Sequence, residues 1–219
     1  MAGKEKRLRT AHGDEFSVYL AGSELSRRAI LILHEWWGIK PHNRDWADRF
    51  ADLGYLALVV DLYDGRVTDD PEEAGRWMRE LDQTLADSKL RAAIEYLRLP
   101  GRRIATYGCS FGGKESMITS LLEPDAVSAT VVAYCRMETQ VEKLRRLKGP
   151  VLAIYAEQER NWPDKQQDFE AAMEQAGKIT ESVSYDAAHG FTNPASPRYD
   201  AAADQAAWDV TLDFFNRNL

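Results

Sequence analysis

The sequence has few of the features that mark secreted, membrane-spanning or metal-binding proteins. Its two cysteines in 219 residues are too few for a disulfide framework and do not have metal-ligand spacing. No apolar run approaches the roughly 20 residues of a membrane span. The segment 1–7 lacks the apolar stretch of a secretory signal. We therefore expect a protein of the reducing cytoplasm with no membrane partner.

Positive charge is also scarce. The chain carries 28 Lys and Arg residues against 35 Asp and Glu residues, which gives a net charge of −7 at pH 7. Its longest basic run, 143–148, is more typical of a solvated helix end than of a phosphate-binding patch. The charge balance therefore argues against a nucleic-acid partner.

The sequence does contain a regular alternation of apolar strands and helical segments. We expect strands at 16–20, 29–33, 55–60, 103–107, 129–134, 151–156 and 181–185. We expect helices at 43–53, over 71–97 as two helices, at 114–122, at 164–176 and from Ser196 to Phe215. This alternation predicts an α/β fold with a mostly parallel twisted sheet and helices on both faces, in one domain spanning 1–219.

A glycine-rich turn follows the expected strand 103–107. The segment Gly108–Gly112 reads G-x-S-x-G, in which small residues let strand and helix approach closely and leave the Ser110 hydroxyl exposed above the sheet. The backbone N–H of Phe111 then lies at a helix N-terminus, where negative charge is favoured. Taken alone, the motif fits a nucleophile and a turn without chemistry about equally well.

Two further loops at the same edge of the sheet carry the partners that a serine nucleophile requires. A serine hydroxyl needs a neutral histidine to take its proton and a carboxylate to orient that histidine. His189 follows the last expected strand and Glu159 follows the strand before it, in the chain order nucleophile, acid, histidine. Glu157 and Asp164 lie on the same loop as Glu159 and are the alternative acids.

The remaining histidines and the neighbouring cysteine fit these roles less well. His12 lies in the N-terminal segment, His42 lies in a loop that we expect at the surface, and His34 lies beside the aromatic loop 34–38. Cys109 is disfavoured as the nucleophile because aromatic residues occupy the positions two before and two after it, where the elbow needs glycine. We expect Cys109 to be a small packed neighbour.

Five spaced blocks of the chain resemble the dienelactone hydrolase family over nearly its whole length. The blocks are His34–Gly38, Asp61–Tyr63, Gly108–Gly113, Ala156–Pro163 and His189–Phe191. The resemblance implies a compact α/β-hydrolase fold without a large lid that cleaves small esters and lactones.

The resemblance also implies roles for individual residues. Ser110 stands where the family usually has a nucleophilic cysteine, and Glu159 where it usually has aspartate. Glu35 falls on the glutamate that lies beside the resting nucleophile. The backbone N–H groups of Trp36 and Phe111 would form the oxyanion hole.

One departure from the family concerns the substrate. Just after its catalytic histidine, the dienelactone-cleaving type carries an arginine that anchors the substrate carboxylate, whereas this chain has Thr192-Asn193-Pro194. Arg136 and Arg66 are the candidates to supply that charge from neighbouring loops, and both fit surface positions at least as well.

The expected rim is rich in aromatic side chains, which suits a small-molecule pocket. We expect its lining to include Glu35, Trp37, Tyr63, Arg136, Trp162 and Phe191, with Tyr199 as a further candidate. The sequence thus predicts a serine hydrolase of small esters or lactones that forms an acyl-enzyme, needs no cofactor or metal, and is a monomer or small homo-oligomer. The alternatives are a true dienelactone hydrolase of aromatic catabolism and a non-catalytic binding module on a hydrolase fold.

Overall fold

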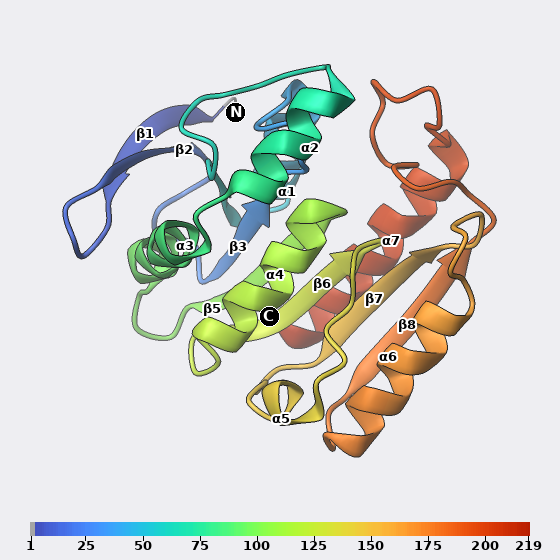
Figure 1. The fold of residues 1–219 in the computed structure, drawn as a ribbon. Helices are drawn as coiled ribbons and strands as arrows, with labels where there is room; N and C mark the ends of the chain where they lie inside the picture. The colour runs from blue at the N-terminus through green and yellow to red at the C-terminus, as the bar shows by residue number, and fades with distance from the viewer. Residues whose placement is uncertain (1–2) are drawn as a thin grey trace.

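Eight strands form one sheet in the computed structural model, which describes residues 3–219 (Figure 1). The predicted domain 1–219 includes residues 1–2, which lie outside the described residues. The strand order is β1-β2-β4-β3-β5-β6-β7-β8. The strands are β1 (Lys4–Arg9), β2 (Glu15–Ala21), β3 (Arg28–Leu33), β4 (Leu56–Val60), β5 (Arg103–Cys109), β6 (Val127–Ala133), β7 (Val151–Ala156) and β8 (Thr180–Tyr185).

The sheet is parallel from β4 to β8. Only β1 and β2 run antiparallel to their neighbours, at one edge of the sheet. The prediction of a mostly parallel sheet is therefore confirmed. Parallel neighbours need crossover connections, which here are helices that cover both faces of the sheet (Figure 1).

The helices divide between the two faces of the sheet. One face is covered by α1 (Pro41–Asp52) and α7 (Ala201–Asn218). The other is covered by α2 (Pro71–Glu80), α3 (Gln83–Leu97), α4 (Phe111–Leu122), α5 (Val141–Leu144) and α6 (Asp164–Gln175). Within residues 3–219, none of these helices is long and apolar enough to cross a membrane.

Successive side chains of the central strands point to opposite faces and build two cores. Ile30 and Ile32 of β3 pack with residues of α1 and α7. Leu31 and Leu33 pack with residues of α2, α3 and α4. All four side chains are fully buried, and each such burial is worth roughly 1.5–3 kcal/mol. The continuous apolar run of β3 therefore reflects a strand that is covered on both sides.

The structure adds one strand to those predicted and shortens one helix. β1 was not predicted because five of its six residues are Lys, Arg or Glu, and its side chains are exposed or half-buried. The last helix begins at Ala201 rather than Ser196, because the Asp200 side chain accepts hydrogen bonds from the N–H groups of Ala202 and Ala203 and caps the helix there. The two helices expected within 71–97 are confirmed as α2 and α3.

Candidate active site

Ser110 occupies a strained turn between β5 and α4. Its φ and ψ are 55° and −121°, a left-handed conformation that costs energy in a residue with a side chain. The strand and the helix approach each other so closely at this turn that a Cβ on Gly108 would lie 2.1 Å from the Gly112 carbonyl oxygen. The Ser110 N–H donates to the Ala133 carbonyl of β6 at 2.9 Å, which fixes the turn to the sheet. The G-x-S-x-G segment therefore has the strand–turn–helix context that its sequence predicts.

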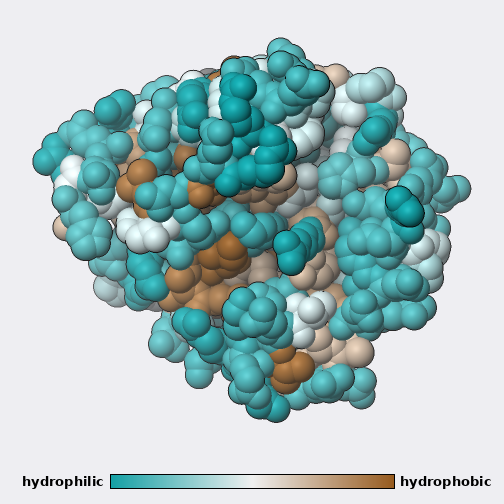
Figure 2. Space-filling view, viewed as in Figure 1, coloured by the Kyte–Doolittle hydropathy of each residue, from teal (hydrophilic) through white to brown (hydrophobic). Residues whose placement is uncertain are grey.

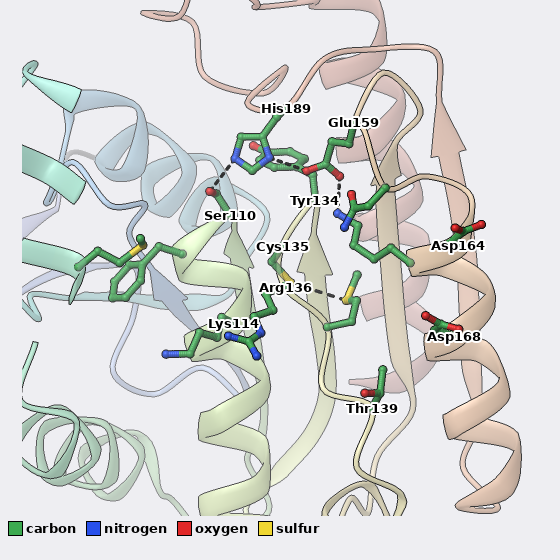
Figure 3. A pocket seen from close by; sticks show the side chains of 15 residues that line it. Ser110, Lys114, Tyr134, Cys135, Arg136, Thr139, Glu159, Asp164, Asp168 and His189 are labelled. Atoms are coloured by element: carbon green, nitrogen blue, oxygen red, sulfur yellow. Dashed lines mark hydrogen bonds and ion pairs between the residues drawn. The ribbon is translucent and has the colours of Figure 1, made fainter. Parts of the chain in front are cut away.

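Three of the predicted side chains meet above the carboxyl ends of β5, β7 and β8 (Figure 3). The Ser110 Oγ lies 2.8 Å from His189 Nε2, and His189 Nδ1 lies 2.7 Å from Glu159 Oε1. The Nδ1–H donates to the carboxylate, so the Nε2 lone pair faces the serine hydroxyl. The alternative acids lie elsewhere: Glu157 accepts from the Ser184 hydroxyl, and Asp164 begins α6.

Glu159 is held as a carboxylate by its surroundings. Burial of the side chain raises its pKa, but hydrogen bonds from His189 and Lys165 outweigh burial and bring the pKa below its ordinary value. The Lys165 ammonium contacts Glu159 Oε2, the oxygen that His189 does not use. An ionised carboxylate on Nδ1 favours the tautomer that accepts a proton at Nε2.

The two thiols are poorly suited to nucleophilic chemistry. Cys109 and Cys135 are both buried, and burial raises the pKa of each thiol to about 12. Cys109 Sγ lies 3.6 Å from the Tyr107 hydroxyl and 3.7 Å from the Thr192 hydroxyl, inside the packed region behind the elbow. This placement agrees with the interpretation of Cys109 as a packed neighbour.

Glu35 lies in a buried polar cluster that borders the same cavity as Ser110. Its Oε2 lies 2.8 Å from His42 Nε2 and accepts from the Asn193 amide at 3.4 Å. The expectation that His42 lies in a surface loop was wrong, because His42 is the second residue of α1 and is 5% exposed. Its imidazole is instead the partner that satisfies the buried Glu35 carboxylate.

His34 connects the aromatic loop after β3 to the loop after β4. Its Nδ1 donates to the Glu35 carbonyl at 2.6 Å, and its Nε2 accepts the Leu62 N–H at 3.1 Å. Burial lowers the pKa of His34, so the ring is neutral and serves both contacts at once. The segment that carries Trp36 is thereby fixed beside the elbow.

Two cavities meet at Ser110 and His189. The first, of about 660 Å³, lies between α4 and α6. Lys114 and Arg136 lie on one side of it, and Asp164 and Asp168 project from α6 on the other (Figure 3). The second, of about 580 Å³, is lined by residues of the aromatic loop and of the segment 193–198. On the face shown in Figure 2, the surface is mostly hydrophilic, and hydrophobic side chains gather in a hollow beside α4.

The predicted pocket residues divide into those that line a cavity and those that do not. Arg136 lines the first cavity, while Glu35, Trp36 and Trp37 line the second. Phe111 also faces the first cavity from the start of α4.

Five other predicted residues do not line either cavity. Tyr63 and Phe191 are fully buried, and they pack on Phe111 and Tyr134 respectively, so we correct their assignment from pocket lining to packing. Trp162 packs against the buried cluster that contains Phe169 and Met173 of α6, and its indole N–H donates to Gln166. Arg66 and Tyr199 also lie away from both cavities: the Arg66 guanidinium lies over the Trp77 ring, and the Tyr199 hydroxyl donates to Asp204.

Three residues that support the site were not predicted from the sequence. Lys165 contacts the acid, the Tyr134 ring packs edge-on against His189 at 5.2 Å, and Asn193 reaches Glu35. Only their position in loops at the carboxyl ends of the strands, or at the start of α6, could have pointed to them.

Within residues 3–219, no group of three or more His, Cys, Asp or Glu side chains is arranged to hold a metal ion.

Comparison with known proteins identifies the family. The family model described as "Dienelactone hydrolase family" matches residues 16–219. The chain belongs to the dienelactone hydrolase family. It is similar to protein usf of Aquifex pyrophilus, with 25% identity over 95% of this chain and 96% of that protein. It is also similar to the carboxymethylenebutenolidase of Rhodococcus opacus, with 25% identity over 87% of this chain and 81% of that enzyme.

A solved structure named m3DLH shares the fold. It superimposes with a TM-score of 0.86 over 100% of both chains at 24% identity. The fold is therefore the α/β-hydrolase fold that the sequence resemblance implied. As a member of this family, the chain is a hydrolase of esters or lactones.

Proposed function

We propose that the chain hydrolyses small carboxylic esters or lactones through a Ser110–His189–Glu159 triad and an acyl-enzyme intermediate. The observation that carries this proposal is the unbroken hydrogen-bond series from Ser110 Oγ through His189 to Glu159 Oε1, at 2.8 and 2.7 Å. Because His189 Nε2 lies 2.8 Å from Ser110 Oγ and both thiols are buried, this geometry favours activation of the serine by proton transfer to Nε2.

Acylation begins when His189 Nε2 takes the Ser110 proton as Oγ attacks the carbonyl carbon. The imidazolium that forms is stabilised by Glu159 through Nδ1–H. The tetrahedral intermediate collapses when the imidazolium gives its proton to the leaving alcohol oxygen. The acyl group then remains as an ester on Ser110.

Deacylation reverses these proton transfers with water as the nucleophile. His189 takes a proton from water as the water oxygen attacks the acyl carbon, and then returns it to Ser110 Oγ as the acid leaves. For a lactone, the leaving alcohol stays attached to the acyl group, and water releases the opened hydroxy acid.

Two backbone N–H groups are available for the oxyanion. The N–H of Phe111 is the first of α4, where helix geometry leaves donors unsatisfied. Among the described residues, neither this N–H nor that of Trp36 has a hydrogen-bond partner. Pre-oriented donors of this kind stabilise the transition state, and removing one typically costs about 10²–10³-fold in rate.

Active-site substitution and covalent labelling test the proposal. We expect Ser110→Ala and His189→Ala to lower kcat for an aryl acetate at least ~10³-fold. A fluorophosphonate should label the wild type at Ser110 but not the alanine variant. Near-wild-type turnover by either variant, in protein that is folded by circular dichroism, would contradict the assignment.

A thiol reagent distinguishes the hydroxyl from the neighbouring sulfur. Because both thiols are buried with a pKa raised to about 12, iodoacetamide should leave ester hydrolysis intact. Inactivation by iodoacetamide, with a modified Cys109, would instead assign the chemistry to the thiol.

Dienelactone is the second candidate substrate. It is favoured by the relative from Rhodococcus opacus, which is named a carboxymethylenebutenolidase. Against it, the segment after His189 offers Asn193, whose amide is directed to Glu35 rather than to a ligand carboxylate. The ratio of kcat/KM for dienelactone to that for p-nitrophenyl acetate decides between the two substrates.

A further inference from the structure

Lys165 is a charged residue of the site that the reaction above leaves without a task. It is the second residue of α6, and its side chain is only 9% exposed. Its ammonium contacts Glu159 Oε2, and the Glu159 side chain is itself 13% exposed. The two carboxylate oxygens are thus divided, with His189 on one and Lys165 on the other.

A glutamate triad acid needs such a contact more than an aspartate does. Glutamate has one more rotatable bond than aspartate, and its terminal torsion has a broad, shallow preference. A hydrogen bond on one oxygen alone leaves the carboxylate free to rotate about that bond. A second, charge-assisted contact on the other oxygen fixes the plane of the carboxylate against the imidazole.

Lys165 is also the cation nearest to the triad acid. The groups in contact with the imidazole are the Ser110 hydroxyl, the Glu159 carboxylate and the neutral Tyr134 ring. The other charged side chains of the first cavity are Lys114, Arg136, Asp164 and Asp168. Those of the second cavity are Glu35, Lys40, Asp69 and Arg198. Among the described residues, Lys165 is the only one of these side chains that contacts Glu159.

We infer that Lys165 is a positioning residue of the triad, which fixes the Glu159 carboxylate in the plane of its contact with His189 and, by its positive charge, disfavours the imidazolium in the resting enzyme. This inference rests on the proposed function and assigns a positioning role to the Lys165–Glu159 ion pair. A carboxylate alone would hold His189 protonated to higher pH and so remove the base. The paired carboxylate orients His189 and leaves it neutral over a wider range of pH.

Three substitutions separate charge from position. Lys165→Gln keeps a hydrogen-bond donor but removes the charge, so the pKa of His189 should rise. The acidic limb of the kcat/KM profile should then move to higher pH by roughly 0.5–1 unit, with a smaller loss of plateau kcat than Lys165→Met causes. Lys165→Met removes charge and donor, so it should shift the limb in the same direction and also lower plateau kcat about tenfold with little change in KM. Lys165→Arg should restore the wild-type profile.

The matched control is Lys178→Met. Lys178 is a half-buried lysine just beyond the end of α6 that donates to the Leu147 carbonyl, away from both cavities, so its loss should leave the limb in place. Circular dichroism confirms that each variant is folded.

An NMR titration of the His189 imidazole in the free protein makes the test independent of turnover. Failure of wild-type ester hydrolysis would contradict the proposed function, while the titration would still measure the effect of Lys165. The inference is overturned if Lys165→Gln leaves the His189 pKa at its wild-type value. It is also overturned if Lys165→Met keeps wild-type plateau kcat, or if Lys165→Arg shifts the limb as the neutral variants do.

Discussion

Gly112 is the point at which the helix after the nucleophile touches the end of β3. A Cβ at this position would lie 2.2 Å from the Leu33 carbonyl oxygen and 2.7 Å from that of His34. Both are backbone atoms of a buried strand end, so neither can move aside as a flexible side chain would. The contact sets the distance between the turn that carries Ser110 and the loop that carries Trp36. Position 112 therefore requires glycine, because the backbone of α4 passes too close to the end of β3 to leave room for a side chain.

We predict that Gly112→Ala lowers the free energy of unfolding by roughly 2 kcal/mol or more, because the added methyl overlaps backbone. Gly75→Ala is the matched control. Gly75 lies inside α2, where the nearest atom to an added Cβ is the end of the flexible Arg79 side chain at 3.1 Å. Alanine there should leave stability unchanged or raise it by up to about 1 kcal/mol. Urea unfolding of both variants measures the difference, and equal effects would contradict this explanation.

At the residue scale, spacing along the chain could not decide which acid serves His189. Glu157, Glu159 and Asp164 all follow β7, and the choice depends on how that loop turns. The Glu157 N–H pairs with the Tyr185 carbonyl of β8, which continues the sheet by one residue and turns its side chain toward Ser184. Such a register is a property of the folded sheet. The partners of buried His42 were hidden for the same reason, since Glu35 belongs to a different loop.

At the scale of elements, helix ends are set by single side chains. Asp70, Asp82 and Asp200 each accept hydrogen bonds from the first N–H groups of α2, α3 and α7. Asp70 directly precedes the helical segment expected over 71–97, whereas Asp82 lies inside that segment. The third was obscured, because Ser196-Pro197 also has the pattern of a helix start. Two competing start signals in one segment cannot be ranked without the tertiary contacts of the loop.

We predict that Asp200→Ala lowers the free energy of unfolding by about 1 kcal/mol, since two N–H groups at the start of α7 lose their acceptor. Asp209→Ala serves as the control, because Asp209 is exposed in the middle of the same helix and bonds only to the Gln205 side chain among the described residues. That change should stay within about 0.5 kcal/mol of wild type. Thermal unfolding of the pair decides, and a control as damaging as the cap variant would refute the assignment.

The edge strand β1 shows an element that hydropathy alone does not reveal. Its pairing with β2 comes from backbone hydrogen bonds, while its side chains are mostly charged and exposed. Charged side chains on an edge strand discourage pairing with a second chain. The sequence pattern of 4–9 therefore indicates only a polar N-terminal segment, although its backbone forms a regular β-strand.

At the scale of the whole molecule, Glu159, the proposed triad acid, links stability to pH. The folded-state pKa of Glu159 lies below its ordinary value of about 4.5. The ionised carboxylate therefore stabilises the folded state at pH values above about 4.5. The contribution is lost as pH falls through the folded-state pKa. We predict that the difference in unfolding free energy between wild type and Glu159→Gln is largest near neutral pH and narrows below pH ~4.5. Urea unfolding at three pH values tests this, and a constant difference would contradict it.

The overall architecture was accessible from the sequence because it depends on repeated signals. The seven predicted strands are all present, and the six from β3 to β8 are joined by helices and pair in parallel. The pocket was less accessible. Tyr63 and Phe191 lie in the predicted loops, yet their rings turn inward and pack against Phe111 and Tyr134. An aromatic residue at a rim serves packing or substrate depending on a side-chain torsion, which local sequence does not determine. The monomeric or small oligomeric state and the cytoplasmic location stay predictions.

The meeting of two cavities at Ser110 and His189 has a consequence for molecular traffic. Only these two side chains belong to the linings of both cavities. For the proposed acyl-enzyme mechanism, we expect the two halves of a cleaved ester to occupy separate cavities, so that the alcohol leaves without passing the acyl group. We expect water to enter through the cavity that the alcohol has just left. The walls of one cavity would then select the acyl group, and the walls of the other would select the alcohol or water that exchanges on it.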